Sequence, residues 1–115
     1  RDGFGRPRHA QLNACSAEEL IEALIAAERD QWRTFVLLSH GDELMVPNRN
    51  RADPTVVRRF EKLCRFLAAN CETLPTTGFN DLPRQPLPRK LPLPQVGKFA
   101  TSKRFVEQAY RRIHQ

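Results

Sequence analysis

A run of prolines limits what this chain can fold into more than any other feature. The stretch PRQPLPRKLPLP, from Pro83 to Pro94, contains five prolines in twelve residues. Proline has no backbone N–H and interrupts both helices and central strands. We therefore expect residues 83–97 to form an extended, semi-rigid connector. The 115-residue chain is then divided into residues 1–82, this connector, and a C-terminal segment of residues 98–115.

Two stretches before the connector have helical periodicity. Ser16 and Glu19 have the spacing of a capping box, and the apolar residues that follow lie on one face, which predicts a helix from Ala17 to about Arg29. Asp53 followed by Pro54 is typical of a second helix start, with apolar residues again on one face. A third helix is predicted after the connector, because residues 98–115 combine an apolar side with many basic residues.

Three other stretches are predicted to be strands. Residues 8–15 loosely alternate, and residues 74–77 form a short β-prone stretch. Residues 34–39, TFVLLS, are nearly all apolar, which is typical of a strand buried on both faces of a parallel sheet. The order strand, helix, strand, helix, strand predicts an α/β fold of parallel βαβ units. So few units would suit part of a larger α/β structure.

His40 is the candidate catalytic residue, because it follows the most apolar predicted strand. Working residues of parallel α/β folds gather at the carboxyl ends of strands, and a histidine can transfer a proton near neutral pH. The alternative is an ordinary strand-end histidine bonded to the backbone. The three histidines show no HxxxH or HxxH spacing, and no CxxC or glycine-rich phosphate loop occurs. We therefore expect no metal to bind to this chain alone.

The positive charge is concentrated in the last third of the chain. Residues 83–115 hold eight Lys or Arg against one acid, a net charge of +7, whereas residues 1–82 have a net charge of −1. A basic amphipathic helix could contact an anionic partner, which would make the chain a non-catalytic binding module. The alternative is a helix that packs back on the rest through Phe105, Val106 and Tyr110. Nucleic acid is not expected as a partner, because one Tyr and one Trp offer little stacking surface.

The lack of membrane-spanning and secretory segments and the pattern of cysteines both bear on the cellular compartment of the protein. No run of about 18 apolar residues predicts a transmembrane helix, and no secretory signal stands at the start of this sequence. The three cysteines form no recognisable disulfide pattern and are expected to be small buried hydrophobic residues. These observations slightly favour a cytoplasmic location.

Four ordered elements between residues 8 and 82 resemble a known family. They are a helix that opens with Ser-x-Glu-Glu-Leu, an apolar strand that ends in Leu-x-His, a helix containing RRFEKLCRFLA, and a strand near Thr-x-x-Phe. In this order they resemble the C-terminal part of polysaccharide deacetylases of the NodB-homology family. The resemblance implies the C-terminal portion of a distorted (β/α) barrel over residues 1–82, followed by the connector and the C-terminal helix.

The same resemblance implies an activity. The family removes acetyl groups from acetylated sugars with a divalent metal, commonly zinc, so the full-length protein would act on an acetylated carbohydrate. It places His40 as the general acid and Leu38 in the apolar pocket for the acetyl methyl group. The family's catalytic-base aspartate and metal ligands lie in earlier motifs, which this sequence lacks. The isolated chain is therefore expected to be inactive.

Overall fold

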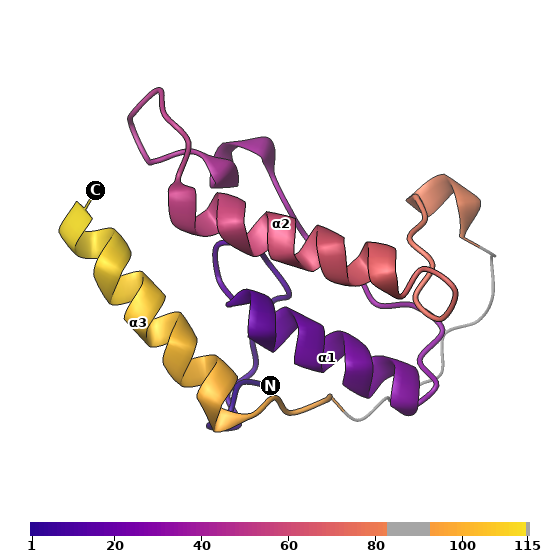
Figure 1. Cartoon of the computed structure of the whole chain (residues 1–115). Coiled ribbons are helices and arrows are strands. Elements are labelled where there is room, and N and C mark those ends of the chain that lie inside the picture. The colour runs from indigo at the N-terminus through magenta and orange to yellow at the C-terminus, as the bar shows by residue number, and fades with distance from the viewer. Residues whose placement is uncertain (83–92, 115) are drawn as a thin grey trace.

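The computed structural model describes residues 1–82 and 93–114, which fold into three helices joined by long connecting segments (Figure 1). Helix α1 spans Ala17–Arg29, α2 spans Pro54–Ala69 and α3 spans Lys98–His114. Two short 3₁₀ turns, η1 at Gly41–Leu44 and η2 at Phe79–Asp81, interrupt the connections. None of these helices is long and apolar enough to span a bilayer.

The first two helices begin where the sequence predicts them to begin. The Ser16 hydroxyl accepts a hydrogen bond from the Glu19 N–H at 3.2 Å, and the Glu19 carboxylate accepts one from the Ser16 N–H at 3.0 Å, which completes the capping box. The Asp53 carboxylate accepts the backbone N–H groups of Thr55 and Val56 at the start of α2. These caps satisfy backbone donors that no helical partner reaches. The predictions for α1 and α2 are confirmed.

The prediction of an α/β fold is wrong. Within residues 1–82 and 93–114 there is no strand, only an isolated parallel bridge between Gln11 and Leu38 and an isolated antiparallel bridge between Met45 and Ala52. The protein is predominantly helical, which does not fit βαβ units or a fragment of a (β/α) barrel. The assignment to the polysaccharide deacetylase family that the resemblance implied is therefore wrong.

Each predicted strand fails for a physical reason. Residues 8–15 bend, because the N–H groups of Ala14 and Cys15 both turn back to the carbonyl of Gln11. Residues 34–38 and 74–77 do have irregular, non-helical backbone, but neither stretch has a neighbouring strand among the residues that the structure describes. β-propensity describes how well a residue suits a pleated surface. It cannot supply the second strand that a sheet requires.

The hydrophobic core lies between α1, α2 and the segments beside them. Figure 1 shows α1 and α2 side by side, running in the same direction, with α3 lying across the ends where they begin. The buried apolar residues that pack together are Leu12, Cys15, Leu20, Leu24, Val56 and Leu63. Phe35 and Leu37 pack against this cluster from the extended segment. Cys64 and Cys71 are exposed, so only Cys15 is the buried thiol that we expected.

Most of the proline-rich connector predicted for residues 83–97 lies outside the described residues, which resume at Leu93. Residues 93–97 are not helical and lead directly into α3 at Lys98. The division of the chain into residues 1–82, 83–97 and 98–115 stays a prediction.

Candidate functional site on the outer face of α3

Helix α3 has its polar side inward and its apolar side outward. It lies across the first turns of α1 and α2 (Figure 1), and its buried residues are Ala100, Thr101 and Arg104. Its large apolar side chains point the other way and are exposed: Phe99, Phe105, Val106, Tyr110 and Ile113. This orientation is the reverse of the usual amphipathic helix, whose apolar stripe faces the core.

A buried ionic cluster fixes the first half of α3. Arg104 forms ion pairs with Asp2 at 3.2 Å and with Glu19 at 3.4 Å, and all three side chains are at most 3% exposed. Thr101 donates a hydrogen bond to Glu19 at 2.7 Å and accepts one from the Gly3 N–H at 2.8 Å. Charges that are buried this completely persist only when they are paired and hydrogen-bonded. The cluster therefore specifies which side of α3 faces inward.

Three further contacts continue this pattern along the helix. Lys103 pairs with Glu18 at 2.5 Å, and Glu18 also pairs with Lys62 of α2. Although partial burial alone would raise the pKa of Glu18, the hydrogen bonds from Lys103 and Lys62 lower this pKa to about 2. Near the other end, Arg111 pairs with Asp53 at 2.7 Å. Acidic residues favour the first turns of helices, and here they also bind the basic side of α3.

Arg59 connects α2 to the same network. Its side chain is 2% exposed, pairs with Glu107 of α3 at 2.7 Å and donates to the carbonyls of Leu12 and Asn13. Arg59 is therefore buried in the interior, although Arg58 and Arg65 of the same helix are exposed. Together, these contacts neutralise Lys103, Arg104 and Arg111, so much of the positive charge of α3 is used inside the molecule.

The outward surface of α3, which we call the α3 outer face, consists of Phe4 and the five exposed apolar residues of the helix. Phe99, Val106, Tyr110 and Ile113 are spaced to form one stripe. Phe4 lies against Phe105 with ring centroids 6.3 Å apart, which widens the stripe beside the helix. The alternative in which Phe105, Val106 and Tyr110 pack inward is therefore wrong, since all three are exposed.

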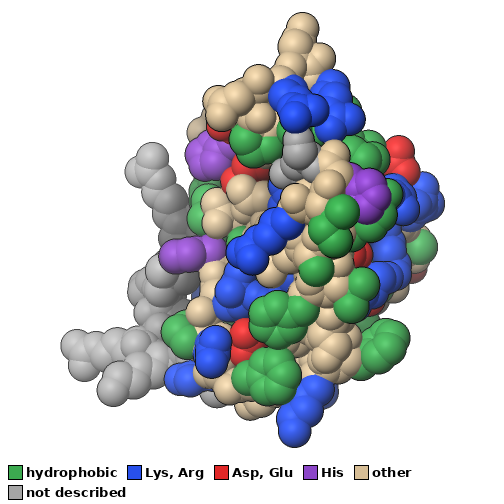
Figure 2. Space-filling model, turned by 90° about the vertical axis from the view of Figure 1, so that its left-hand side faces the viewer, with side chains coloured by type: hydrophobic (Ala, Val, Ile, Leu, Met, Phe, Trp, Pro, Cys, Tyr) green, Lys and Arg blue, Asp and Glu red, His purple; other side chains and the backbone are tan. Residues whose placement is uncertain are grey.

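Cations border the α3 outer face, and Figure 2 shows apolar and basic side chains side by side on this surface. Lys98 and Arg112 are exposed at opposite ends of the helix, and neither forms an ion pair with any described residue. Arg51 donates to the carbonyl of His114 at 3.2 Å, which brings a further cation to the end of the helix. Four nearby acids lie behind the helix, bound to cations: Asp2, Glu18, Glu19 and Asp53. The acid of the helix itself, Glu107, is paired with Arg59.

His40 and Leu38 lie elsewhere, between the extended segment and η1. His40 is exposed and its backbone caps η1, while its side chain makes no capping bond. Leu38 is 44% exposed. The structure leaves the proton-transfer role of His40 and the acetyl-binding role of Leu38 as predictions. No group of three or more His, Cys, Asp or Glu side chains within residues 1–82 and 93–114 is placed to hold a metal ion.

The sequence did contain a signal for the reversed helix. Residues 1–82 hold twelve acids, and three of them stand at helix starts: Glu18, Glu19 and Asp53. The last third of the chain is almost purely basic. Complementary charge between these two regions could have predicted that the basic side of α3 packs inward.

Comparisons of the chain with protein-family models, with curated proteins and with solved structures find no match.

Proposed function

We propose that the chain is a non-catalytic binding module that attaches to the surface of an anionic lipid bilayer through the α3 outer face. The observation that carries the proposal is the exposure of Val106 and Ile113, which are 69% and 77% exposed in the middle and at the end of one stripe. Exposing this stripe to water is energetically unfavourable. Large contiguous apolar patches are accordingly rare on proteins that bind nothing there.

The arrangement of charge favours a lipid surface. Aromatic and aliphatic side chains on one helix face, with Lys and Arg beside them, are the features of helices that lie in a membrane interface. The unpaired cations Lys98 and Arg112 would meet lipid phosphates, and each cation near an anionic surface contributes about 1 kcal/mol. The acids behind the helix are already neutralised by partners, so they would not repel such a surface.

The shape and charge of the face count against a second copy of the chain. Antiparallel pairing of two α3 helices would bring Lys98 of one copy to the Arg112 end of the other, and parallel pairing would bring like ends together. Either arrangement opposes like charges across the contact. Two cavities of the described chain, of about 550 and 340 Å³, are both lined by residues outside α3. Neither cavity therefore offers the α3 outer face a place for an inserted ligand.

Vesicle binding tests the proposal. The purified chain is sedimented with phosphatidylcholine vesicles that contain, or lack, phosphatidylserine. We expect binding only with phosphatidylserine, and we expect it to weaken as salt rises, because ions screen exposed charges. Arg112→Gln should reduce the partition constant by about fivefold, the equivalent of one cation at the surface.

Matched variants distinguish binding through the α3 outer face from non-specific adsorption to vesicles. Val106→Glu and Ile113→Glu change exposed side chains, so the fold should persist while vesicle binding is lost. Ile25→Glu makes the same change at an exposed position of α1, away from this face, and should bind like the parent. Equal binding by all three variants, or binding to neutral vesicles alone, would rule the proposal out. Stable dimers that Val106→Glu dissolves would instead assign the face to a second copy of the chain.

A further inference from the structure

A second feature, independent of the α3 outer face, is an extended segment, residues 34–38, most of whose main-chain groups form no hydrogen bond with the described residues. Residues 34–38 alternate as a strand does: Phe35 and Leu37 pack against the core cluster, while Val36 and Leu38 are each 44% exposed. Successive side chains of a strand point to opposite faces in this way. The segment therefore has the side-chain alternation of a strand but is not part of a sheet among the described residues.

Backbone hydrogen bonds attach the two ends of this segment to the rest of the molecule, whereas its middle forms none with the described residues. Before it, the Trp32 N–H donates to the Ala27 carbonyl at 2.8 Å, and at its end the Leu38 N–H donates to the Ala10 carbonyl at 2.9 Å. Between these points no backbone N–H or C=O of residues 34–37 forms a hydrogen bond with any part of the chain that the structure describes. An extended segment whose main-chain groups are unpaired in this way is a template for pairing with another chain.

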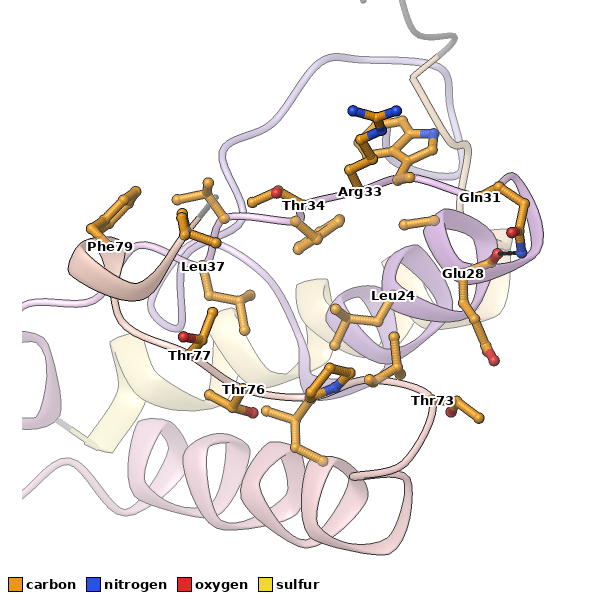
Figure 3. Close-up of a pocket in the computed structure, with 18 residues that line it drawn as sticks. Leu24, Glu28, Gln31, Arg33, Thr34, Leu37, Thr73, Thr76, Thr77 and Phe79 are labelled. Atoms are coloured by element: carbon orange, nitrogen blue, oxygen red, sulfur yellow. Dashed lines mark hydrogen bonds between the residues drawn. The ribbon is translucent and has the colours of Figure 1, made fainter. Parts of the chain in front are cut away.

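A cavity of about 550 Å³ lies along this segment (Figure 3). The segment that carries Thr34 and Leu37 forms one wall, and the segment that carries Thr76 and Thr77 forms the opposite one. The backbone N–H groups of Thr76 and Thr77 are also unpaired among the described residues. The volume falls within the range of ligand-binding pockets.

The direction of the unpaired groups is set by the alternation of the strand. Because the Leu38 N–H points to Ala10, the N–H groups of Phe35 and Leu37 point to the opposite edge. The cavity is lined by both residues. The cavity therefore offers several donors that lack an acceptor.

We propose that this cavity accepts an extended segment of another polypeptide, which adds to residues 34–37 as a β-strand. Along the wall formed by residues 34–37, main-chain N–H donors alternate with C=O acceptors at the spacing of a β-strand. Another extended main chain carries the complementary pattern of donors and acceptors. Leu24, Leu67 and Leu74 line the cavity alongside threonines. A strand with alternating apolar and small polar side chains fits such a lining.

The test uses a fluorescent synthetic peptide that alternates valine and threonine, with fluorescence anisotropy as the readout. A control peptide has the same side chains but carries N-methyl groups on alternate amides, which removes the donors of one edge. Main-chain pairing tolerates many sequences, so the first peptide should bind saturably. The control should bind at least about tenfold more weakly, since several hydrogen bonds are lost together.

Two measurements locate the binding. Amide exchange by NMR should slow at Phe35 and Leu37 when the peptide is present. Thr76→Trp fills the cavity from an exposed position and should abolish binding, whereas the control Ser102→Trp, on α3, should not. Absence of binding, or equal binding of the N-methylated peptide, would overturn the proposal. Concentration-dependent dimers that protect Phe35 and Leu37 without peptide would overturn it too, because a second copy would then occupy the edge.

Discussion

Arg104 and Asp2 form an ion pair at 3.2 Å between side chains that are 1% and 2% exposed, although they lie 102 residues apart in the sequence. The pair joins the first residues of the chain to the middle of α3. Glu19 of α1 lies within 3.4 Å of the same guanidinium. This arginine therefore contributes to the orientation of α3 and to the exposure of its apolar side.

Replacement of Arg104 by methionine should destabilise the protein by about 3–5 kcal/mol, because it leaves the buried carboxylates of Asp2 and Glu19 without their cation. Urea unfolding followed by circular dichroism measures the change. The control is Arg29→Ala, which breaks an ion pair between exposed, adjacent residues and should change stability little, because water screens exposed ion pairs. Similar small losses for both variants would contradict the structural role of Arg104.

Gly3, which lies where the first residues of the chain contact the start of α3, should tolerate no side chain. A Cβ atom on Gly3 would lie 2.6 Å from the Cα of Lys98 and 2.8 Å from the Gly97 carbonyl oxygen. Backbone atoms cannot rotate away, so Gly3→Ala should push α3 from the first residues and cost about 1–3 kcal/mol. Gly41→Ala is the matched control, since nothing lies within 4 Å of its Cβ position. Equal melting temperatures for the two variants would show that the junction is looser than this packing.

Acid should weaken the docking of α3 through Glu18. Its pKa is lowered from 4.5 to about 2 in the folded protein, although burial alone would raise it, because Lys103 and Lys62 bind the carboxylate. Its stabilising contribution is therefore complete above about pH 4.5 and is lost as the pH falls toward 2. We expect the free energy of unfolding to decline across this window.

The variant Glu18→Gln identifies the group, because it should flatten that decline while lowering stability at neutral pH. Glu61→Gln is the matched control, since Glu61 is exposed on α2 and has only a 3.8 Å contact with Arg65. A decline of the same steepness in the Glu18→Gln protein would assign the acid sensitivity to other carboxylates.

The three thiols should react at different rates. Cys64 and Cys71 are exposed, whereas Cys15 is buried and its thiol lies 3.2 Å from the His9 carbonyl oxygen. Burial raises the pKa of Cys15, so both access and the thiolate fraction are reduced. Reaction with Ellman's reagent at neutral pH should show two fast thiols, with the third appearing only in denaturant. Three fast thiols, or a slow phase that persists in a Cys15→Ser variant, would contradict this placement.

The helices were predictable from sequence because their signals are local. The capping box of Ser16 and Glu19 and the Asp53–Pro54 start lie within a few residues of the turns that they fix. The apolar run at residues 34–39 gave an equally clear local signal for extended backbone. A sheet, however, needs a second strand, and within the described part of the chain the only bridge of this run joins Leu38 to Gln11.

The candidate site was less predictable, because it depends on contacts between distant residues. The periodicity of α3 identifies Val106 and Ile113 as apolar, but it does not say whether they face the core. That orientation is decided by Asp2, Glu19 and Asp53, which lie far away in the sequence. The pattern alone favoured the usual inward packing, and the buried ion pairs reverse it.

The contacts that join the first residues of the chain to α3 affect the order in which the protein folds. Helical proteins usually fold fast because most of their contacts join near neighbours in the chain. Here α1 and α2 can pair early, whereas Gly3 and Thr101 must meet across 98 residues, which closes a very long loop. We therefore expect two kinetic phases in refolding, with the docking of α3 as the later one.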